Sequence, residues 1–271
     1  MKKNRIKLCF EKLKTEKKAA LIAFLTAGDP NLELSSRLIN ALPKAGADLI
    51  EIGMPFSDPM ADGPIIQRSY IRALKSGISM NKTLGIVKKF RKENNYTPII
   101  LMGYYNPIYQ MGINNFLGRA KASGVDGVLI VDLSPESSEE IYKEIKKSSL
   151  DFIRLASPTT DLKRMDEILK KSSGFIYYVS ITGVTGSKLT KLVDIKKKYL
   201  SLKAKTKLPF VIGFGINSPK KAKDIASYSD GVVIGSNLIK EIENNINCDS
   251  KIKDNVINLV KKYSKALNKK K

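Results

Sequence analysis

Short apolar runs rich in β-branched residues recur along the chain, and segments with helical periodicity separate them. Eight of these runs have the length of a buried strand, at 20–25, 48–53, 97–102, 127–132, 151–156, 175–180, 208–213 and 230–235. Helical patterns between them include 34–46, 81–93, 113–124, 137–148, 161–172 and 218–229. Strands separated by helices pair in parallel, and eight parallel strands close a TIM (β/α)8 barrel. An open doubly wound sheet is the structural rival, although no GxGxxG pattern follows the first run.

The 271 residues are predicted to form a single domain, 1–271, because α/β barrels routinely reach about 200–250 residues. We expect a barrel core at about 18–245, an extra N-terminal helix at 1–17 and a basic C-terminal helix or tail at 246–271. No apolar run approaches the ~20 residues of a membrane span, and the N-terminal stretch fits neither a signal peptide nor a transit peptide. The sequence therefore predicts a soluble intracellular protein, of the cytoplasm or of a plastid stroma.

The chain contains no histidine, which excludes His-ligated metal sites, Ser-His-Asp or Cys-His nucleophile pairs and imidazole acid–base chemistry. Its two cysteines, Cys9 and Cys248, lie at opposite ends of the chain and form no CxxC pair. We therefore expect two inert thiols and no metal site. Proton transfer in this protein must use Asp, Glu, Tyr, Lys or Cys.

The formal net charge is +22, from 48 Lys and Arg against 26 Asp and Glu. Such a balance is a hint of nucleic acid or another anionic partner. The lysines, however, are spread over helical segments and a basic tail, with no aromatic residues interleaved and no recognition helix. Solvated basic helix faces explain the charge better, so we expect no nucleic-acid partner.

Glycine-rich loops follow the seventh and eighth predicted strands, where TIM barrels commonly bind phosphate. The loops are GFGINSP (213–219) and GSNLI (235–239), and each runs into a helix start whose dipole favours an anion. Ordinary turn glycines explain most single GxG pairs, but two such loops in these positions indicate a phosphate site. The candidate backbone donors are Gly213, Gly215, Gly235 and Ser236.

Glu51 interrupts the second apolar run, where a buried strand normally carries valine or isoleucine. Side chains alternate along a strand, so Leu49, Glu51 and Gly53 share one face. If Leu49 faces the barrel interior, Glu51 points into the barrel mouth, where burial raises the pKa of a carboxyl group toward neutral pH. The residues alone leave two roles open: an acid–base catalyst, or a structural partner of a barrel cation such as Arg154.

The segment ADLIEIGMPFSDPMADGPIIQ closely resembles the strand-two signature of the tryptophan synthase alpha chain family. The resemblance continues in matching order over residues 15 to 245, through AFLTAGDPN, YYNPI, VDGVLIVDL, ASPTTD, YYVSITGVTG, GFGI and GVVIGS. It implies a TIM-barrel lyase that cleaves indole-3-glycerol phosphate to indole and glyceraldehyde 3-phosphate. It also implies an alpha2-beta2 tetramer with a beta chain, which holds the pyridoxal phosphate, whereas the alpha chain needs no cofactor.

Carried over by motif, the resemblance makes Glu51 the catalytic acid–base and Asp62 its partner carboxylate. Tyr177 matches an active-site tyrosine of the family. Thr185, in the TGVTG loop with Gly186, matches the threonine that closes onto the Asp62 loop. Both loop residues are expected to contact the substrate.

Phe24, Ile66 and Tyr104 fit an indole pocket wall, although each also fits plain core packing. Asp58 is interpreted as a turn residue ahead of Pro59. Two rival functions stay open at this point: a phosphate-binding barrel such as a sugar-phosphate isomerase, and a basic nucleic-acid-binding protein. The spacing of Glu51 and Asp62 argues against the isomerase.

Overall fold

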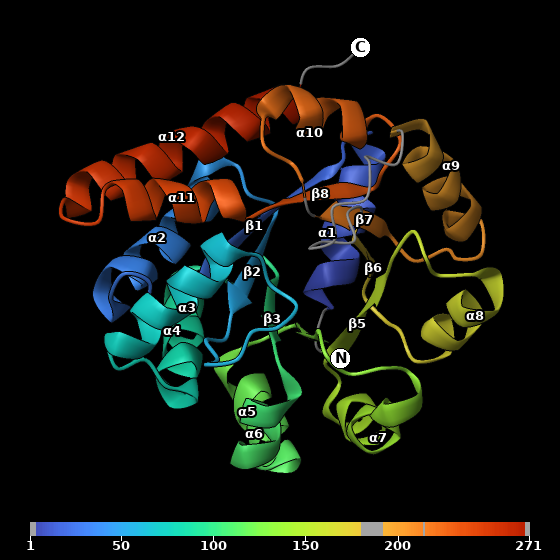
Figure 1. Cartoon of the computed structure of the whole chain (residues 1–271), viewed down its shortest axis with the longest axis horizontal. Coiled ribbons are helices and arrows are strands. Elements are labelled where there is room, and N and C mark those ends of the chain that lie inside the picture. Colours follow the sequence, from blue (N-terminus) through green and yellow to red (C-terminus); the bar gives the residue numbers. More distant parts are fainter. Residues whose placement is uncertain (1–3, 180–191, 214, 269–271) are drawn as a thin grey trace.

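A closed barrel of parallel strands forms the centre of the molecule (Figure 1). The structure is a computed structural model that describes residues 4–179, 192–213 and 215–268. Each strand pairs with the next one along the chain, and β8 returns to pair with β1. The strands are β1 (Ala20–Thr26), β2 (Leu49–Gly53), β3 (Ile99–Gly103), β4 (Gly127–Ile130), β5 (Asp151–Ala156), β6 (Ile176–Val179), β7 (Phe210–Gly213) and β8 (Gly231–Ile234). This confirms the predicted TIM barrel and excludes the open sheet, and each predicted apolar run overlaps one of these strands.

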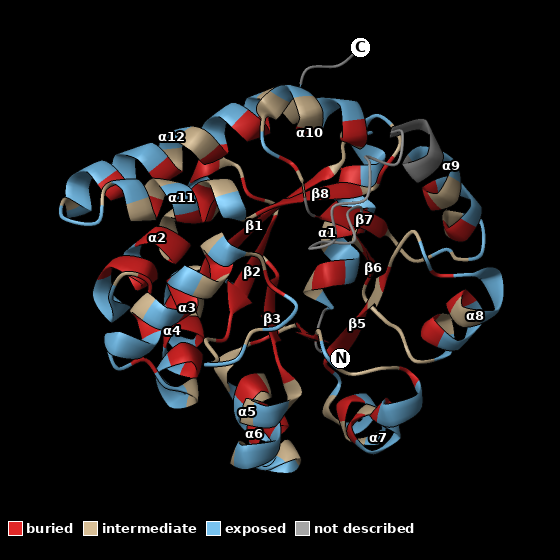
Figure 2. Ribbon diagram, viewed as in Figure 1, coloured by how far each residue is buried: buried red, intermediate tan, exposed pale blue. Residues whose placement is uncertain are grey.

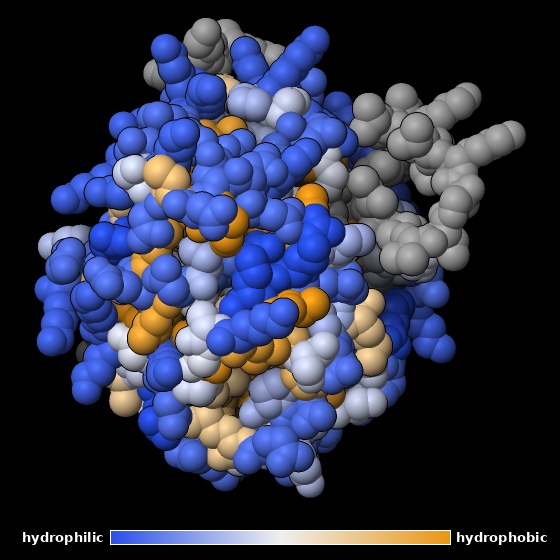
Figure 3. Space-filling model, turned by 60° about the vertical axis from the view of Figure 1, so that its left-hand side comes forward, coloured by the Kyte–Doolittle hydropathy of each residue, from blue (hydrophilic) through white to orange (hydrophobic). Residues whose placement is uncertain are grey.

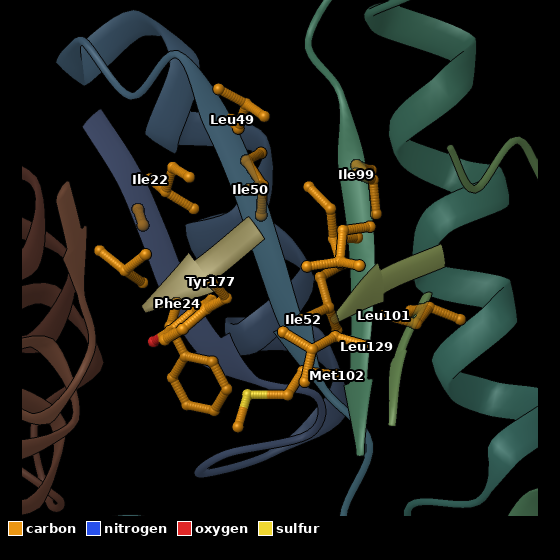
Figure 4. Close-up of a cluster of buried hydrophobic side chains, with 14 of the residues drawn as sticks. Ile22, Phe24, Leu49, Ile50, Ile52, Ile99, Leu101, Met102, Leu129 and Tyr177 are labelled. Carbon is orange, nitrogen blue, oxygen red and sulfur yellow. The ribbon is translucent and has the colours of Figure 1, made fainter. Parts of the chain in front are cut away.

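Nearly every strand residue is buried, as Figure 2 shows by the red ring of strands. Parallel strands in such a barrel are covered on both faces, by the interior side chains and by the helices outside. This explains why the strand segments read as continuous apolar runs rather than as alternating patterns. The interior is packed with large side chains, several of which are drawn in Figure 4.

The outer helices present buried residues inward and exposed residues outward (Figure 2), and Figure 3 shows that hydrophilic residues dominate the face of the molecule seen there. Asn31, Ser79, Asp161 and Ser218 each cap a helix by accepting a hydrogen bond from a first-turn backbone N–H. The helices and one 3-10 turn are α1 (Arg5–Thr15), α2 (Leu32–Ala45), α3 (Pro64–Lys75), α4 (Met80–Glu93), α5 (Tyr105–Met111), α6 (Ile113–Ser123), η1 (Glu136–Ser138), α7 (Glu139–Ser148), α8 (Leu162–Lys170), α9 (Leu192–Lys203), α10 (Pro219–Ala226), α11 (Ser236–Asn244) and α12 (Asp249–Asn268).

Helix α1 covers the end of the barrel where the strands begin. Asn4 donates a 2.9 Å hydrogen bond to Asp151, the first residue of β5, and Arg5 pairs with Asp126 just before β4 at 2.8 Å. The ring of Phe10 packs against Phe175, which immediately precedes β6, with ring centroids 5.7 Å apart. With this end closed, the open mouth of the barrel is the opposite end, where the strands finish.

Helix α12 packs along α2, α10 and α11 on the outside of the barrel (Figure 1). Its buried residues recur at helical spacing, at Ile252, Val256, Val260 and Tyr263, and the lysines lie between them. The predicted N-terminal and C-terminal helices are thus both present. Across the described part of the chain, neither α12 nor a shorter helix is long and apolar enough to cross a membrane.

Candidate active site

Glu51 lies on the interior face of the barrel. A β-carbon on Gly53 would strike the ring of Phe24, and Glu51, two residues earlier, shares that face. The register agrees, because Phe24 of β1 and Ile100 of β3 are the direct neighbours of Glu51. The prediction that Leu49 and Glu51 both face the interior is therefore confirmed, with Glu51 nearer the open mouth.

The Glu51 carboxyl group is buried, and it is unpaired in the part of the chain that the structure describes. Glu51 is only 2% exposed, and within the described residues neither of its carboxyl oxygens has a hydrogen-bond partner. Burial, with a smaller contribution from the charge of Asp62, raises the pKa of Glu51 to about 8. The alternative of a structural ion pair with Arg154 is wrong, because Arg154 lies on the outer face of β5 and forms no such pair with Glu51.

Asp62 comes from the loop between β2 and α3 and is also buried, at 7% exposure. The hydroxyl group of Tyr104, just after β3, donates a 2.7 Å hydrogen bond to Asp62 Oδ2. Gln67 on α3 donates to the backbone carbonyl of Asp62 at 2.9 Å, which fixes the loop from the other side. Burial raises the pKa of Asp62 to about 6, although the Tyr104 hydrogen bond opposes this shift.

Tyr177 crosses the barrel interior from β6. Its phenol occupies the place that a β-carbon on Gly213 would take, since such an atom would overlap both the ring and the hydroxyl group. Burial raises the pKa of Tyr177 well above its usual value, and the charges of Glu51 and Asp62 add to the shift. The three side chains are thus close enough to act on one another electrostatically.

A pocket of about 620 Å³, which includes space open to solvent, lies beside these groups. Figure 4 shows Phe24, Tyr177 and Met102 around this part of the interior. The lining combines apolar side chains, Asp62 and two glycine-rich loops. The lining residues are Phe24, Asp62, Ile66, Met102, Tyr177, Gly215, Ile216, Asn217, Val233, Gly235, Ser236 and Asn237.

One end of the pocket has the features of an anion site. Ser236 is the first residue of α11, and its N-cap Gly235 has no side chain that could occupy the free N–H groups of the first turn. Gly215 has a φ of 72°, a left-handed conformation that glycine adopts without strain. A phosphate group is the ligand that such an arrangement favours.

The structure brings most of the predicted site residues together, with three changes of position. Glu51 and Gly213 are not among the residues that line the pocket. Tyr104 does not line it either and instead holds Asp62. Thr185 and Gly186 lie outside the described residues. Asp58, expected to be a turn residue, is exposed and accepts a hydrogen bond from Ser57.

Sequence reasoning did not single out Asn217, Asn237 or Met102. Both asparagines lie within the glycine-rich loops after β7 and β8, so their position could have identified them. Met102 is the last interior residue of β3 before Gly103, in register with Gly53, which only the strand pairing reveals.

Residues 10–268 of this chain match the model of the protein family described as tryptophan synthase alpha chain. The chain belongs to the tryptophan synthase alpha chain family. Members of this family are carbon–carbon lyases that cleave indole-3-glycerol phosphate to indole and glyceraldehyde 3-phosphate. They act as the alpha subunit in the last step of tryptophan biosynthesis, and the chain has the same activity. It accounts for a pocket with an apolar part and an anion-binding end.

Solved structures agree with membership in the tryptophan synthase alpha chain family. The alpha subunit from Legionella pneumophila strain Paris is 42% identical with a TM-score of 0.92, over 98% of each chain. The alpha chain from Legionella pneumophila subsp. pneumophila is 41% identical with a TM-score of 0.90, over 98% of this chain and 97% of that one. A tryptophan synthase structure from M. tuberculosis, in an aminoacrylate-bound form, is 27% identical with a TM-score of 0.85, over 97% of this chain and 99% of that one.

Proposed function

We propose that Glu51 is the acid–base catalyst of the carbon–carbon cleavage. The observation that carries this proposal is a buried interior carboxyl group, without a partner in the described residues, whose pKa is raised to about 8. A group with such a pKa exchanges protons readily near neutral pH. Glu51 protonates indole C3 and removes the proton of the adjacent glycerol hydroxyl group, and the bond between C3 and the glycerol carbon then breaks to leave indole and an aldehyde.

Asp62 is proposed to stabilise the positive charge that develops on the indole ring. Protonation at C3 makes the ring an indolenine-like cation, and a carboxylate can accept a hydrogen bond from the ring N–H. Asp62 lines the pocket, and its pKa of about 6 leaves it largely ionised at pH 7. Phe24 and Ile66 supply the apolar wall for the ring.

The phosphate group of the substrate is proposed to bind Gly215, Gly235 and Ser236. All three residues line the pocket. Gly235 and Ser236 lie at the start of α11, where backbone N–H groups and the helix dipole favour an anion, and Gly215 lies in the loop after β7. Thr185 and Gly186 are proposed to complete the enclosure of the substrate from the loop after β6. This chemistry uses only side chains and backbone of the chain, so no cofactor is required, and pyridoxal phosphate belongs to the beta chain.

The lip of the barrel next to Asp62 is proposed to dock the tryptophan synthase beta chain in an alpha2-beta2 tetramer. Met60 in the β2–α3 loop is 80% exposed, and Tyr109 on α5 is 60% exposed, which is unusual for side chains of this size. Phe56 joins the two segments by packing on Tyr104, with ring centroids 5.4 Å apart. A partner on this lip would order the loop that carries Asp62.

The test is to supply indole-3-glycerol phosphate and to measure indole release with and without a beta chain. We expect slow release by the chain alone and faster release with the beta chain, together with co-migration of the two proteins on a sizing column. A Glu51→Gln variant should co-migrate equally well but release almost no indole. Full activity of the chain alone without association would contradict the docking proposal, and an active Glu51→Gln variant would contradict the catalytic one.

A further inference from the structure

Arg154 is a buried cation that has no ion-pair partner among the described residues. Its neighbour Leu155 is in register with interior Tyr177, so Arg154 points outward from β5, toward the layer where α7 and α8 pack (Figure 1). The residue is 3% exposed, and no partner for its Nη1 is found within the described residues. Leaving a charged group in this state is costly unless something pairs with it.

A pocket of about 1110 Å³, partly open to solvent, adjoins this guanidinium. It is separate from the lyase pocket, because none of its lining residues is shared with that site. Arg154 and Arg164 are its basic residues, and three hydroxyl groups lie beside them in the β5–α8 loop. Ser157 Oγ is 2.8 Å from Thr159 Oγ1 and 3.3 Å from Thr160 Oγ1.

The acids near this pocket do not neutralise Arg154. Glu136 forms an ion pair with Arg164. Asp132 is itself a lining residue of the pocket, and its carboxylate accepts a hydrogen bond of 2.9 Å from the backbone N–H of Tyr105. Burial and the charge of Arg164 lower the pKa of Arg154 to about 10, with only a partial opposing effect from Glu136. The ring of Phe152, 4.7 Å from the guanidinium carbon, provides a cation–π contact, which is weaker than a bound anion.

We propose that this pocket is a second ligand site, which binds a small molecule through a phosphate or carboxylate group held by Arg154. A guanidinium presents several N–H donors in a planar fork that matches both groups. The Ser157, Thr159 and Thr160 hydroxyl groups are bonded to one another, which leaves one O–H donor of this cluster for a ligand oxygen. The site lies at the end of β4, β5 and β6, between the barrel mouth and α8. It does not depend on the proposed roles of Glu51 and Asp62.

The test is a calorimetric titration with inorganic phosphate at constant ionic strength. Because phosphate also fits the lyase pocket, all variants carry Gly235→Val, whose larger side chain would collide with Phe24 and close that site. In this background we compare Arg154→Met, Arg154→Lys and a control, Arg119→Met, which removes one charge from the exposed surface of α6. We expect the Gly235→Val protein and its Arg119→Met derivative to bind one phosphate with equal affinity.

Arg154→Met should weaken that binding by about tenfold or more, since a charge-assisted bidentate contact is lost. Arg154→Lys keeps the positive charge but loses the planar arrangement of guanidinium donors, so it should bind phosphate with intermediate affinity. This variant can still test the proposal if Arg154→Met folds poorly. The proposal is overturned if the Gly235→Val protein binds no phosphate. Equal binding by the Arg154 and Arg119 variants would also overturn it.

Discussion

Tyr104 donates a hydrogen bond of 2.7 Å to Asp62 Oδ2, and its hydroxyl oxygen accepts one of 3.0 Å from the backbone N–H of Ala61. One phenol thus holds both the carboxylate and the backbone of the β2–α3 loop. Tyr104 comes from the start of α5, so the position of Asp62 depends on an element that is distant in sequence. We therefore regard Tyr104 as a positioning residue rather than as a wall of the indole pocket.

Tyr104→Phe should lower kcat by roughly 10- to 100-fold, the effect of losing one hydrogen bond to a charged group. That hydrogen bond lowers the pKa of Asp62, so its loss should move the acidic limb of the pH–rate profile to higher pH. A purely structural role would change activity without moving the limb. Tyr105→Phe is the control, since Tyr105 packs on Tyr109 instead, and its profile should match that of the unmodified protein.

Glu51→Gln keeps the size of the side chain but cannot transfer a proton. We expect kcat to fall by at least ~10²–10⁴. Glu93→Gln, on the exposed surface of α4, should leave kcat unchanged. Steady-state assays of both variants measure kcat, and circular dichroism verifies that the variants are folded. A folded Glu51→Gln protein with normal turnover would exclude acid–base catalysis by Glu51.

The stability of the protein should fall as pH rises from about 4.5 to about 8 because of Glu51. Its ordinary pKa is 4.5 and the folded value is about 8, so over this window the unfolded chain ionises while the folded protein keeps the proton. Asp62, raised from 3.8 to about 6, acts in the same direction over a lower window. Glu51→Gln removes the larger effect.

The free energy of unfolding, measured in urea at pH 5 and pH 8, should therefore separate the two proteins. Glu51→Gln should gain stability relative to the unmodified protein as pH rises, by roughly a few kcal/mol at most. If the free energy of unfolding of Glu51→Gln is instead lower than that of the unmodified protein at pH 8, the Glu51 carboxylate has a stabilising partner. That result would contradict the interpretation that ionised Glu51 destabilises the folded protein.

The sequence alone predicted the barrel because every strand lies between helices and is buried on both faces, which leaves a visible apolar run. Glu51 was visible for the same reason, as a carboxyl group inside such a run. The catalytic geometry was less accessible, since the Tyr104–Asp62 bond joins residues 42 positions apart and depends on two loops meeting above β2 and β3. For Gly213 the structure adds a reason that the sequence did not show, because the phenol of Tyr177 from the neighbouring strand occupies the space that a side chain at this position would need.

Replacement of two glycines near the site by alanine should affect different properties of the protein. In Gly213→Ala the new methyl group must displace the Tyr177 ring, so we expect a loss of about 1–3 kcal/mol in stability and a lower kcat. In Gly235→Ala the methyl group would lie 3.2 Å from the Phe24 β-carbon, a small conflict at the proposed phosphate end, so KM should rise more than kcat falls.

Gly118→Ala on α6 is the control for both variants. Beyond its chain neighbours and the backbone of its own helix, no atom of the described residues lies within 4 Å of the added β-carbon. This change should therefore stabilise the protein by about 0.5–1 kcal/mol and leave both kinetic constants unchanged. The measurements are thermal unfolding and initial rates over a range of indole-3-glycerol phosphate concentrations. An unchanged KM in a folded Gly235→Ala protein would remove Gly235 from the phosphate site. A stable Gly213→Ala protein with normal kcat would show that Tyr177 can leave the space above residue 213 without consequence for catalysis.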